Sequence, residues 1–200
     1  IGDDGLEKIK LGPETPTGEA FTDFHEYIKN LSQRGIALGV CSKNEESIAK
    51  EGFHHQGARL SVEDFSSFKA NWSRKDENLL GIAEDLNMGI DSFVFVDDNP
   101  SEQEVVRQSL SEVSVPALDG DVTKYIATLE WSGYFEALNI SEEDLHRKEL
   151  YQSNVERKKF SQSITDYSEF LKSLNMGAQI GSFRKQHYER IWQLINKTNQ

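Results

Sequence analysis

Little in this sequence would bind nucleic acid, form disulfides or span a membrane. Lysine and arginine total 22 against 34 acidic residues, for a formal net charge of −12. Since nucleic-acid binding depends on basic side chains that neutralise phosphates, we expect no nucleic-acid partner. The single cysteine, Cys41, excludes an intrachain disulfide and a cysteine-based zinc site, which favours a reducing compartment. No stretch approaches the roughly 18 apolar residues of a membrane span, so we expect a cytoplasmic protein with no membrane partner.

Proline is also scarce, at four residues, and there is no low-complexity tract or internal repeat. With 36% hydrophobic and 28% charged residues, the composition is typical of a folded chain. A length of 200 residues accommodates one complete α/β domain and part of a second. Because the chain opens at Ile1 without methionine and stops at Gln200 in or just after a predicted helix, we expect a piece of a longer protein.

Helical periodicity and short apolar runs alternate along most of the chain. Apolar residues three and four positions apart predict a helix over 21–31 that stops at Gly35. Further helices are expected to start at Ser42, Lys75 and Pro100, and another is expected over 122–135. Short runs typical of buried strands lie at 36–41, near Phe68, at 92–96 and at 113–115. This alternation predicts an α/β fold with a doubly wound parallel sheet of the Rossmann-like type.

The pattern changes after residue 138. A long charged helix over 141–160 has few apolar positions and is typical of a connector. Residues 166–200 predict a helix, a strand over 179–183 and a last helix, which together favour the start of another domain. The predicted organisation is therefore an α/β core at 1–138, a connector helix at 139–165 and a second domain that begins at 166–200.

Polar residues after the predicted strands are the candidates for chemistry, because ligands of open α/β sheets bind beyond the carboxyl ends of the strands. Three positions qualify. Cys41 and Ser42 follow the first run, Lys75 opens a helix, and Asp97 and Asp98 follow the run at 92–96.

The paired carboxylates of Asp97 and Asp98 predict a magnesium site. Their mutual repulsion has to be offset, and Mg²⁺ prefers a few carboxylate oxygens, retained waters and a substrate phosphate. The alternative is a turn in which Asn99 caps the helix opened by Pro100 and Glu102 completes a capping box. Capping accounts for Asn99 but leaves both aspartates unexplained.

The predicted phosphate site consists of Ser42, Lys43 and Asn44 together with Lys75. A hydroxyl and free N–H groups at a helix start would hold a phosphate, although Ser42 followed by Glu45 is also a capping-box pattern. Lys75 lies in a charged cluster of the kind usually found on solvated helix starts. A cation is mildly unfavourable there, which points to another role, and Lys69 is the rival for that role.

The order of these groups resembles a known superfamily. A hydroxyl after one strand, a lysine at a helix start and paired aspartates after the next strand is the order of the second to fourth motifs of the haloacid dehalogenase superfamily. Response-regulator receivers use similar groups, but their acidic pair comes first. FkbH-like proteins, subfamily IIIC of the superfamily, are similar to this chain in six stretches: Gly5–Pro13, Val40–Asn44, Phe68–Trp72, Asp91–Pro100, Gly133–Glu136 and Leu194–Gln200.

The resemblance implies a Mg²⁺-dependent phosphatase and glyceryltransferase. Such an enzyme would dephosphorylate a phosphoglyceryl donor, 1,3-bisphosphoglycerate, and load the glyceryl group onto an acyl carrier protein in polyketide or related secondary-metabolite biosynthesis. Ser42 would bind the phosphoryl oxygens, Lys75 would stabilise their charge, and Asp97 with Asp98 would hold the metal. Cys41 either carries the glyceryl group as a thioester or is a small buried hydrophobe. Longer members of the family continue into an acetyltransferase-like α+β domain, which we expect to begin at 166–200.

One departure from the family concerns the first motif. Asp-x-Asp-x-Thr, which would lie on a strand just before Ile1 and carry the nucleophilic aspartate, does not occur in the sequence. We therefore expect a haloacid-dehalogenase-like sheet that lacks its first strand, and a chain that is inactive alone. The alternatives are a phosphatase of a small phosphorylated metabolite and a catalytically inactive binding module whose acidic face docks a partner.

Overall fold

The structure is a computed structural model that describes residues 9, 11–136, 146–163, 172, 175–178 and 180–197. The chain divides into two compact units, residues 1–160 and 161–200. The domain boundaries predicted after residues 138 and 165 both fall outside the described residues and stay predictions.

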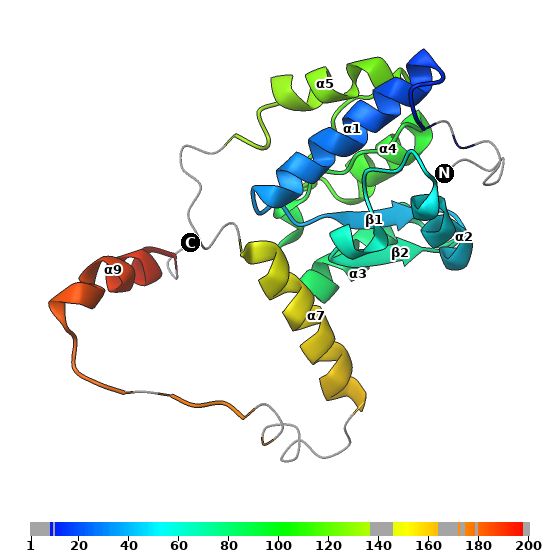
Figure 1. Ribbon diagram of the computed structural model, residues 1–200. Coiled ribbons are helices and arrows are strands. Elements are labelled where there is room, and N and C mark those ends of the chain that lie inside the picture. Colours follow the sequence, from blue (N-terminus) through cyan, green and yellow to red (C-terminus); the bar gives the residue numbers. More distant parts are fainter. Residues whose placement is uncertain are drawn as a thin grey trace. The chain divides into compact units, whose positions relative to one another are not determined.

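The first unit contains two parallel strands, β1 (Gly39–Ser42) and β2 (Ser67–Ala70), which pair in the register Gly39 to Ser67. The chain between them includes helix α2 (Glu46–Glu51), and α3 (Lys75–Leu86) packs against both strands (Figure 1). Parallel strands joined by a crossover that contains a helix are the α/β unit that the sequence predicts. The strand near Phe68 is confirmed, whereas the first one begins at Gly39 instead of Ile36 and reaches Ser42.

The regular strand predicted at 92–96 is not formed. Ile90–Ser92 make a 3-10 helix, η4, and Val94 makes an isolated parallel bridge to Ser114. The N–H of Phe95 donates to the Ser114 carbonyl at 2.8 Å, and the N–H of Ser114 donates to the Phe93 carbonyl at 3.0 Å. The strand predicted at 113–115 is reduced to the other half of this bridge. Pairing in this segment is limited to the single bridge to Ser114 in the part of the chain that the structure describes, so neither run extends into a ladder.

Helices occupy most of the positions that the periodicity predicts. They are α1 (Pro16–Gln33), α4 (Pro100–Ser109), α5 (Tyr125–Trp131) and α7 (Arg147–Ser163), with 3-10 turns η2 (Gly52–His54), η3 (Val62–Asp64) and η5 (Val122–Lys124). The predicted helix start at Ser42 is wrong, because Ser42 ends β1 and the helix α2 begins at Glu46. The helix expected over 122–135 is shorter, since Gly133 adopts a φ of 68° that ends it.

The ends of α1 follow directly from its sequence. The Thr15 hydroxyl accepts a hydrogen bond from the Gly18 N–H at 3.0 Å, and Pro16 occupies the first helical position. Gly35, with a φ of 91°, follows the last turn and confirms the predicted stop.

The core around the parallel strands is made by α3, α4 and the segment at 93–96. Leu79, Phe95, Val106 and Val113 form a buried cluster, and Cys41 packs against it. A second cluster joins the region of η5 to α1 through Tyr125, whose ring meets the Phe24 ring edge-on at 5.4 Å. These contacts fix α3 and α4 so that both helices start at the carboxyl ends of the strands.

The second unit contains η6 (Lys185–His187) and α9 (Tyr188–Lys197). The strand expected over 179–183 is wrong for residues 180–183, which the structure describes without strand geometry, and residue 179 lies outside the described residues. The final helix is confirmed. The acetyltransferase-like character of this region stays a prediction.

Candidate active site

The ammonium group of Lys75 joins two of the predicted site segments. Lys75 is the first residue of α3, and its Nζ donates to Asp97 Oδ2 at 2.7 Å and to the Cys41 carbonyl oxygen at 2.9 Å. The side chains of Lys75 and Asp97 are 10% and 8% exposed. The same ammonium lies 5.8 Å from the centroid of the Phe95 ring, which adds a favourable electrostatic contact. The structure thus brings the predicted lysine, one predicted aspartate and the tip of β1 together.

Asp97 is held by a backbone N–H and by a glutamine side chain as well as by Lys75. Its Oδ1 accepts from the Asn99 N–H at 2.9 Å, and its carbonyl oxygen accepts from Gln103 Nε2 at 2.7 Å. Gln103 is 2% exposed and also donates to the Leu118 carbonyl at 3.0 Å. The carboxylate is therefore fixed in position. The positive charge of Lys75 offsets part of the repulsion between the paired aspartates, for which the sequence predicted a metal.

The helix cap predicted at Asn99 is confirmed, but its capping box is not. Asn99 Oδ1 accepts from the Ser101 N–H at 2.9 Å. The Glu102 carboxylate, which would complete the box, instead accepts from Lys43 Nζ at 2.6 Å. This ion pair joins the loop after β1 to the start of α4 and so connects two edges of the site.

An amide pair ties the end of β2 to α3. Asn71 Nδ2 donates to Asn78 Oδ1 at 3.1 Å and Asn78 Nδ2 donates to Asn71 Oδ1 at 2.9 Å. The backbone N–H of Asn71 donates to the Ser42 carbonyl at 3.1 Å. Asn78 is 7% exposed and lies one turn beyond Lys75. The amide pair therefore helps to fix the start of α3, and with it Lys75, relative to the carboxyl ends of the strands.

The predicted phosphate-binding residues lie next to the ion pair on the loop after β1. The Ser42 capping box is wrong, because Ser42 is part of β1 and Glu45 is the residue before α2. Lys43 is held by Glu102, and the Asn44 side-chain oxygen accepts from the Glu45 N–H at 2.8 Å. The phosphate-binding roles of Ser42, Lys43 and Asn44 stay predictions.

Lys69, the rival for the lysine role, points to a different partner. It lies on β2 and its Nζ contacts Asp85 Oδ2 at 2.7 Å, where the Ser67 hydroxyl also donates at 3.1 Å. The carboxylate that Lys69 engages belongs to α3 and is not one of the paired aspartates. The geometry therefore favours Lys75.

Cys41 lies beside Lys75 but in an environment that keeps its thiol protonated. Burial raises the pKa of the Cys41 thiol to about 11, against the opposing effect of the Lys75 charge. The negative charge of Asp97 acts in the same direction as burial. The sulfur lies 3.6 Å from the Lys75 carbonyl oxygen, to which the S–H donates. These features favour a buried structural thiol over a nucleophile, and the acyl-carrying role stays a prediction.

The paired aspartates meet part of the requirement for magnesium. Asp98 is exposed, so its carboxylate is available beside the fixed carboxylate of Asp97. Across the described residues, no group of three or more His, Cys, Asp or Glu side chains is placed to hold a metal ion. Mg²⁺ nevertheless binds through one or two carboxylates plus waters and substrate phosphate. The donor set fits magnesium in this mode, with the remaining ligands supplied from elsewhere.

One solved structure is similar to this chain over most of its length. It is the N-terminal part of the protein BF1531 from Bacteroides fragilis, which contains a phosphatase domain and was crystallised with Mg. The two are 43% identical, with a TM-score of 0.66, over 68% of this chain and 37% of the other. No protein-family model matches the chain. No curated protein matches it either.

The comparison supports the broad form of the sequence predictions. The chain shares the α/β fold of a phosphatase domain, consistent with a haloacid-dehalogenase-like fold, and the metal in that domain is consistent with the prediction of Mg²⁺. The FkbH-like resemblance stays a prediction. Within the described residues, no helix has the length and apolar character that a membrane crossing requires. A cytoplasmic location stays a prediction.

Three amides that support the site were not predicted from the sequence: Asn71, Asn78 and Gln103. Asn71 lies two residues after Lys69 in a stretch that the family resemblance covers, so its position after a predicted strand was a usable signal. Nothing local marks Asn78 or Gln103, since polar residues on helices are usually solvent-facing. Their burial arises from the packing of α3 and α4.

Proposed function

We propose that this chain is part of a Mg²⁺-dependent phosphoryl-transfer enzyme of the haloacid dehalogenase type. The observation that carries the proposal is the buried contact of 2.7 Å between Lys75 and Asp97 at the carboxyl end of β1. The Mg-bound phosphatase domain of the Bacteroides fragilis neighbour supports the same class.

Each residue has a role that follows from its position. Asp97 and Asp98 would hold the metal, which when bound would neutralise charge on the phosphoryl oxygens. Lys75 orients the Asp97 carboxylate through its ion pair and lies at the carboxyl end of β1 through its hydrogen bond to the Cys41 carbonyl. Ser42 presents a hydroxyl that can donate to a phosphoryl oxygen. Catalysis of this type depends mainly on positioning and electrostatic stabilisation.

The more specific form of the proposal is glyceryl transfer. In that form a phosphoglyceryl donor, 1,3-bisphosphoglycerate, loses phosphate and its glyceryl group passes to an acyl carrier protein. Support for it comes from the six stretches that resemble FkbH-like proteins. Hydrolysis of a small phosphorylated metabolite is the second candidate, and similarity to a phosphatase domain favours it.

The thiol of Cys41 separates two versions of glyceryl transfer. In the covalent version its sulfur attacks the acyl-phosphate carbonyl and the C1 phosphate leaves; water then hydrolyses the C3 phosphate, and the glyceryl thioester is exchanged onto the carrier thiol. A thiol pKa of about 11 opposes this version. Transfer without a Cys41 intermediate needs no thiolate from this chain.

Phosphate release tests the broad proposal. We expect Mg²⁺-dependent hydrolysis of p-nitrophenyl phosphate by a version of the protein that carries an Asp-x-Asp-x-Thr strand before Ile1. Asp97→Asn and Lys75→Met should each lower kcat by about a hundredfold or more. Asp91→Asn, the same change at an exposed position just before the bridge segment, is the matched control and should keep full activity. Undiminished turnover in Asp97→Asn would remove the metal assignment.

Carrier loading tests the specific proposal. A mass increase on the phosphopantetheine arm of a carrier protein, obtained with 1,3-bisphosphoglycerate, would support glyceryl transfer. Phosphate release without loading would leave the small-metabolite phosphatase. Loading that persists in Cys41→Ser would exclude the thioester on this residue.

A further inference from the structure

Trp72 is a large apolar residue that stays exposed beside the candidate active site. It follows the end of β2 by two residues and is 65% exposed. One exposed apolar residue on a protein surface is ordinary. Trp72 differs from that ordinary case in where its backbone starts, in how its ring is held and in the charges around it.

The backbone of Trp72 starts next to the tip of β1. The N–H of the preceding residue, Asn71, donates to the Ser42 carbonyl at 3.1 Å. Since paired strands lie about 4.8 Å apart, Trp72 starts roughly one strand spacing from Ser42, whose hydroxyl is predicted to bind phosphate. A group attached to a phosphate at Ser42 by a few bonds can therefore reach the Trp72 ring.

The Trp72 ring is held between the two loops that follow β1 and β2. Its indole N–H donates at 3.1 Å to Oε1 of Glu45, which precedes α2 on the loop after β1. On the other loop, the Ser73 N–H donates to Asn71 Oδ1 at 2.9 Å and so fixes the turn around Trp72. Because Glu45 occupies the polar edge of the indole, the ring offers a ligand its apolar carbon surface. A ring that is already oriented loses little conformational freedom when it binds.

The charges around Trp72 disfavour a second anionic group on the substrate. Lys43, on the same loop as Glu45, is engaged by Glu102 at 2.6 Å. Arg74, two residues after Trp72, is engaged at 2.8 Å by a carboxylate of α3. A second phosphate or a carboxylate near Trp72 would meet the Glu45 carboxylate while both of these cations are already paired. Since like charges at short distance are unfavourable, a neutral group fits this position better.

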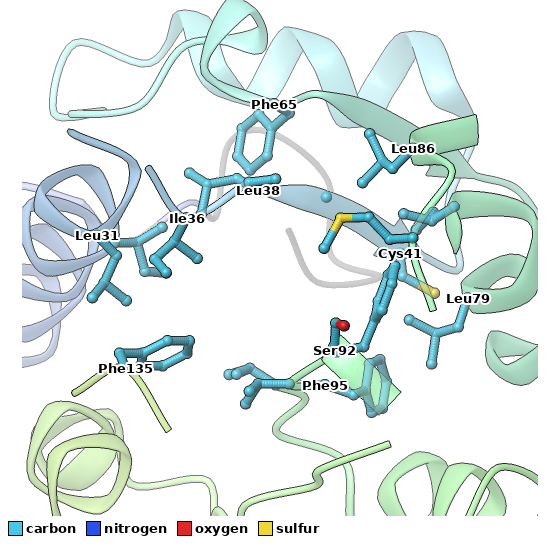
Figure 2. Close-up of a pocket in the computed structure, with 18 of the residues that line it drawn as sticks. Leu31, Ile36, Leu38, Cys41, Phe65, Leu79, Leu86, Ser92, Phe95 and Phe135 are labelled. Carbon is cyan, nitrogen blue, oxygen red and sulfur yellow. The ribbon is translucent and has the colours of Figure 1, made fainter. Parts of the chain in front are cut away.

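The apolar cavity shown in Figure 2 is not an alternative seat for such a group. It has a volume of about 280 Å³ and is surrounded by side chains such as Leu31, Leu38, Leu79 and Phe95. It lies between β1 and the segment at 93–96, where we expect the first strand of the sheet to run. A substrate group is therefore directed to the β2 side of the site, where Trp72 lies.

We propose that Trp72 determines substrate specificity, because its indole face packs against a neutral apolar or aromatic group attached to the phosphate at Ser42. Stacking on an aromatic side chain accepts any flat or apolar surface. The substrate class is therefore a phosphate monoester whose neutral leaving group carries such a surface. This class fits the small-metabolite phosphatase, whereas the charge of a second phosphate counts against 1,3-bisphosphoglycerate. The inference rests on the proposed function, since it requires a phosphate at the strand ends.

Inhibition by phosphonates tests the proposal in the version of the protein that carries an Asp-x-Asp-x-Thr strand before Ile1. Phenylphosphonate and methylphosphonate differ only in the group on phosphorus, and phosphatases do not hydrolyse their carbon–phosphorus bond. Their inhibition constants are measured against p-nitrophenyl phosphate with Mg²⁺. We expect phenylphosphonate to bind roughly tenfold more tightly than methylphosphonate. We expect 3-phosphonopropionate, which carries a carboxylate in place of the ring, to bind no more tightly than methylphosphonate.

Variants of the aromatic residues assign this preference to one ring. Trp72→Ala should bring the two inhibition constants within about twofold of each other, whereas Trp72→Phe, which keeps an aromatic face, should keep most of the difference. Trp131→Ala removes the 91% exposed Trp131 of α5 and is the matched control, which should retain the full difference. In NMR spectra the indole N–H signal of Trp72 should shift with phenylphosphonate, and that of Trp131 should not. If Trp72→Ala does not fold, this shift in the unchanged protein still decides.

Any of four results would overturn the proposal. Equal inhibition constants in the unchanged protein, or a preference that survives in Trp72→Ala, would remove Trp72 from the substrate site and leave the proposed function intact. Tighter binding of 3-phosphonopropionate than of methylphosphonate would mean that the site takes a second anion. An equal shift of the Trp72 signal with pantetheine, which has no phosphate, would assign the ring to a carrier arm. Absence of both hydrolysis and inhibition would remove the proposed function and this inference with it.

Discussion

Removing one member of the Lys75–Asp97 ion pair should lower the free energy of unfolding more than removing both charges. Each side chain is about one-tenth exposed, at 10% and 8%, so an unpaired partner would stay largely out of water. Removal of one member of a buried pair costs about 3–5 kcal/mol, whereas replacement of both by neutral groups is often close to neutral. We therefore expect Lys75→Met and Asp97→Asn each to lower the free energy of unfolding by about 3–5 kcal/mol.

The double variant should be less destabilised than the sum of the single variants. Lys75 also donates to the Cys41 carbonyl at 2.9 Å, so the double variant still loses that hydrogen bond, at about 1 kcal/mol. In urea unfolding curves of the four proteins, the double variant should lose at least about 2 kcal/mol less unfolding free energy than the sum of the two single variants. The exposed pair of Lys124 and Asp119, with side chains both 60% exposed at 3.0 Å, is the matched control and should show little coupling. If the double variant loses as much unfolding free energy as the two single variants together, the reasoning is refuted.

Three further predictions rest on single residues. Because burial raises the pKa of the Cys41 thiol to about 11 from its ordinary 9.0, iodoacetamide should alkylate the folded chain below pH 9 about a hundredfold more slowly than the unfolded chain; equal rates would contradict the burial. Burial, and then the charge of Asp98, raise the pKa of Tyr125 from 10.0 to about 12. The unfolded chain then releases this proton first, so the contribution of Tyr125 to stability is complete below pH 10 and is lost between pH 10 and 12; Tyr125→Phe should flatten that part of the stability profile measured by urea unfolding. Asn99→Ala should lower the free energy of unfolding by about 1 kcal/mol through loss of the cap on α4, whereas Asn99→Ser should keep most of that stability. Equal losses in the two variants would rule out the cap.

Several elements were predictable because their signals are local. Pro100 after Asn99 marked the start of α4, and Gly35 marked the end of α1, since caps and breakers act within one turn. The start of α3 near Lys75 was predictable from the spacing of the apolar residues Leu79, Ile82 and Leu86. The strand expected at 92–96 failed because a ladder depends on its neighbours, and the described neighbour is a single residue, Ser114.

By itself, the amino-acid sequence determined the alternation of helices with apolar runs and the chemical groups at the strand ends, because periodicity and capping are short-range properties. It could not determine which charges meet. Lys75 and Asp97 are 22 positions apart, and Lys43 and Glu102 are 59 apart. Tertiary packing alone decided that these pairs form and that the partly buried Cys41 lies beside Lys75. Such contacts depend on how the chain crosses over between strands, and no local propensity encodes that path.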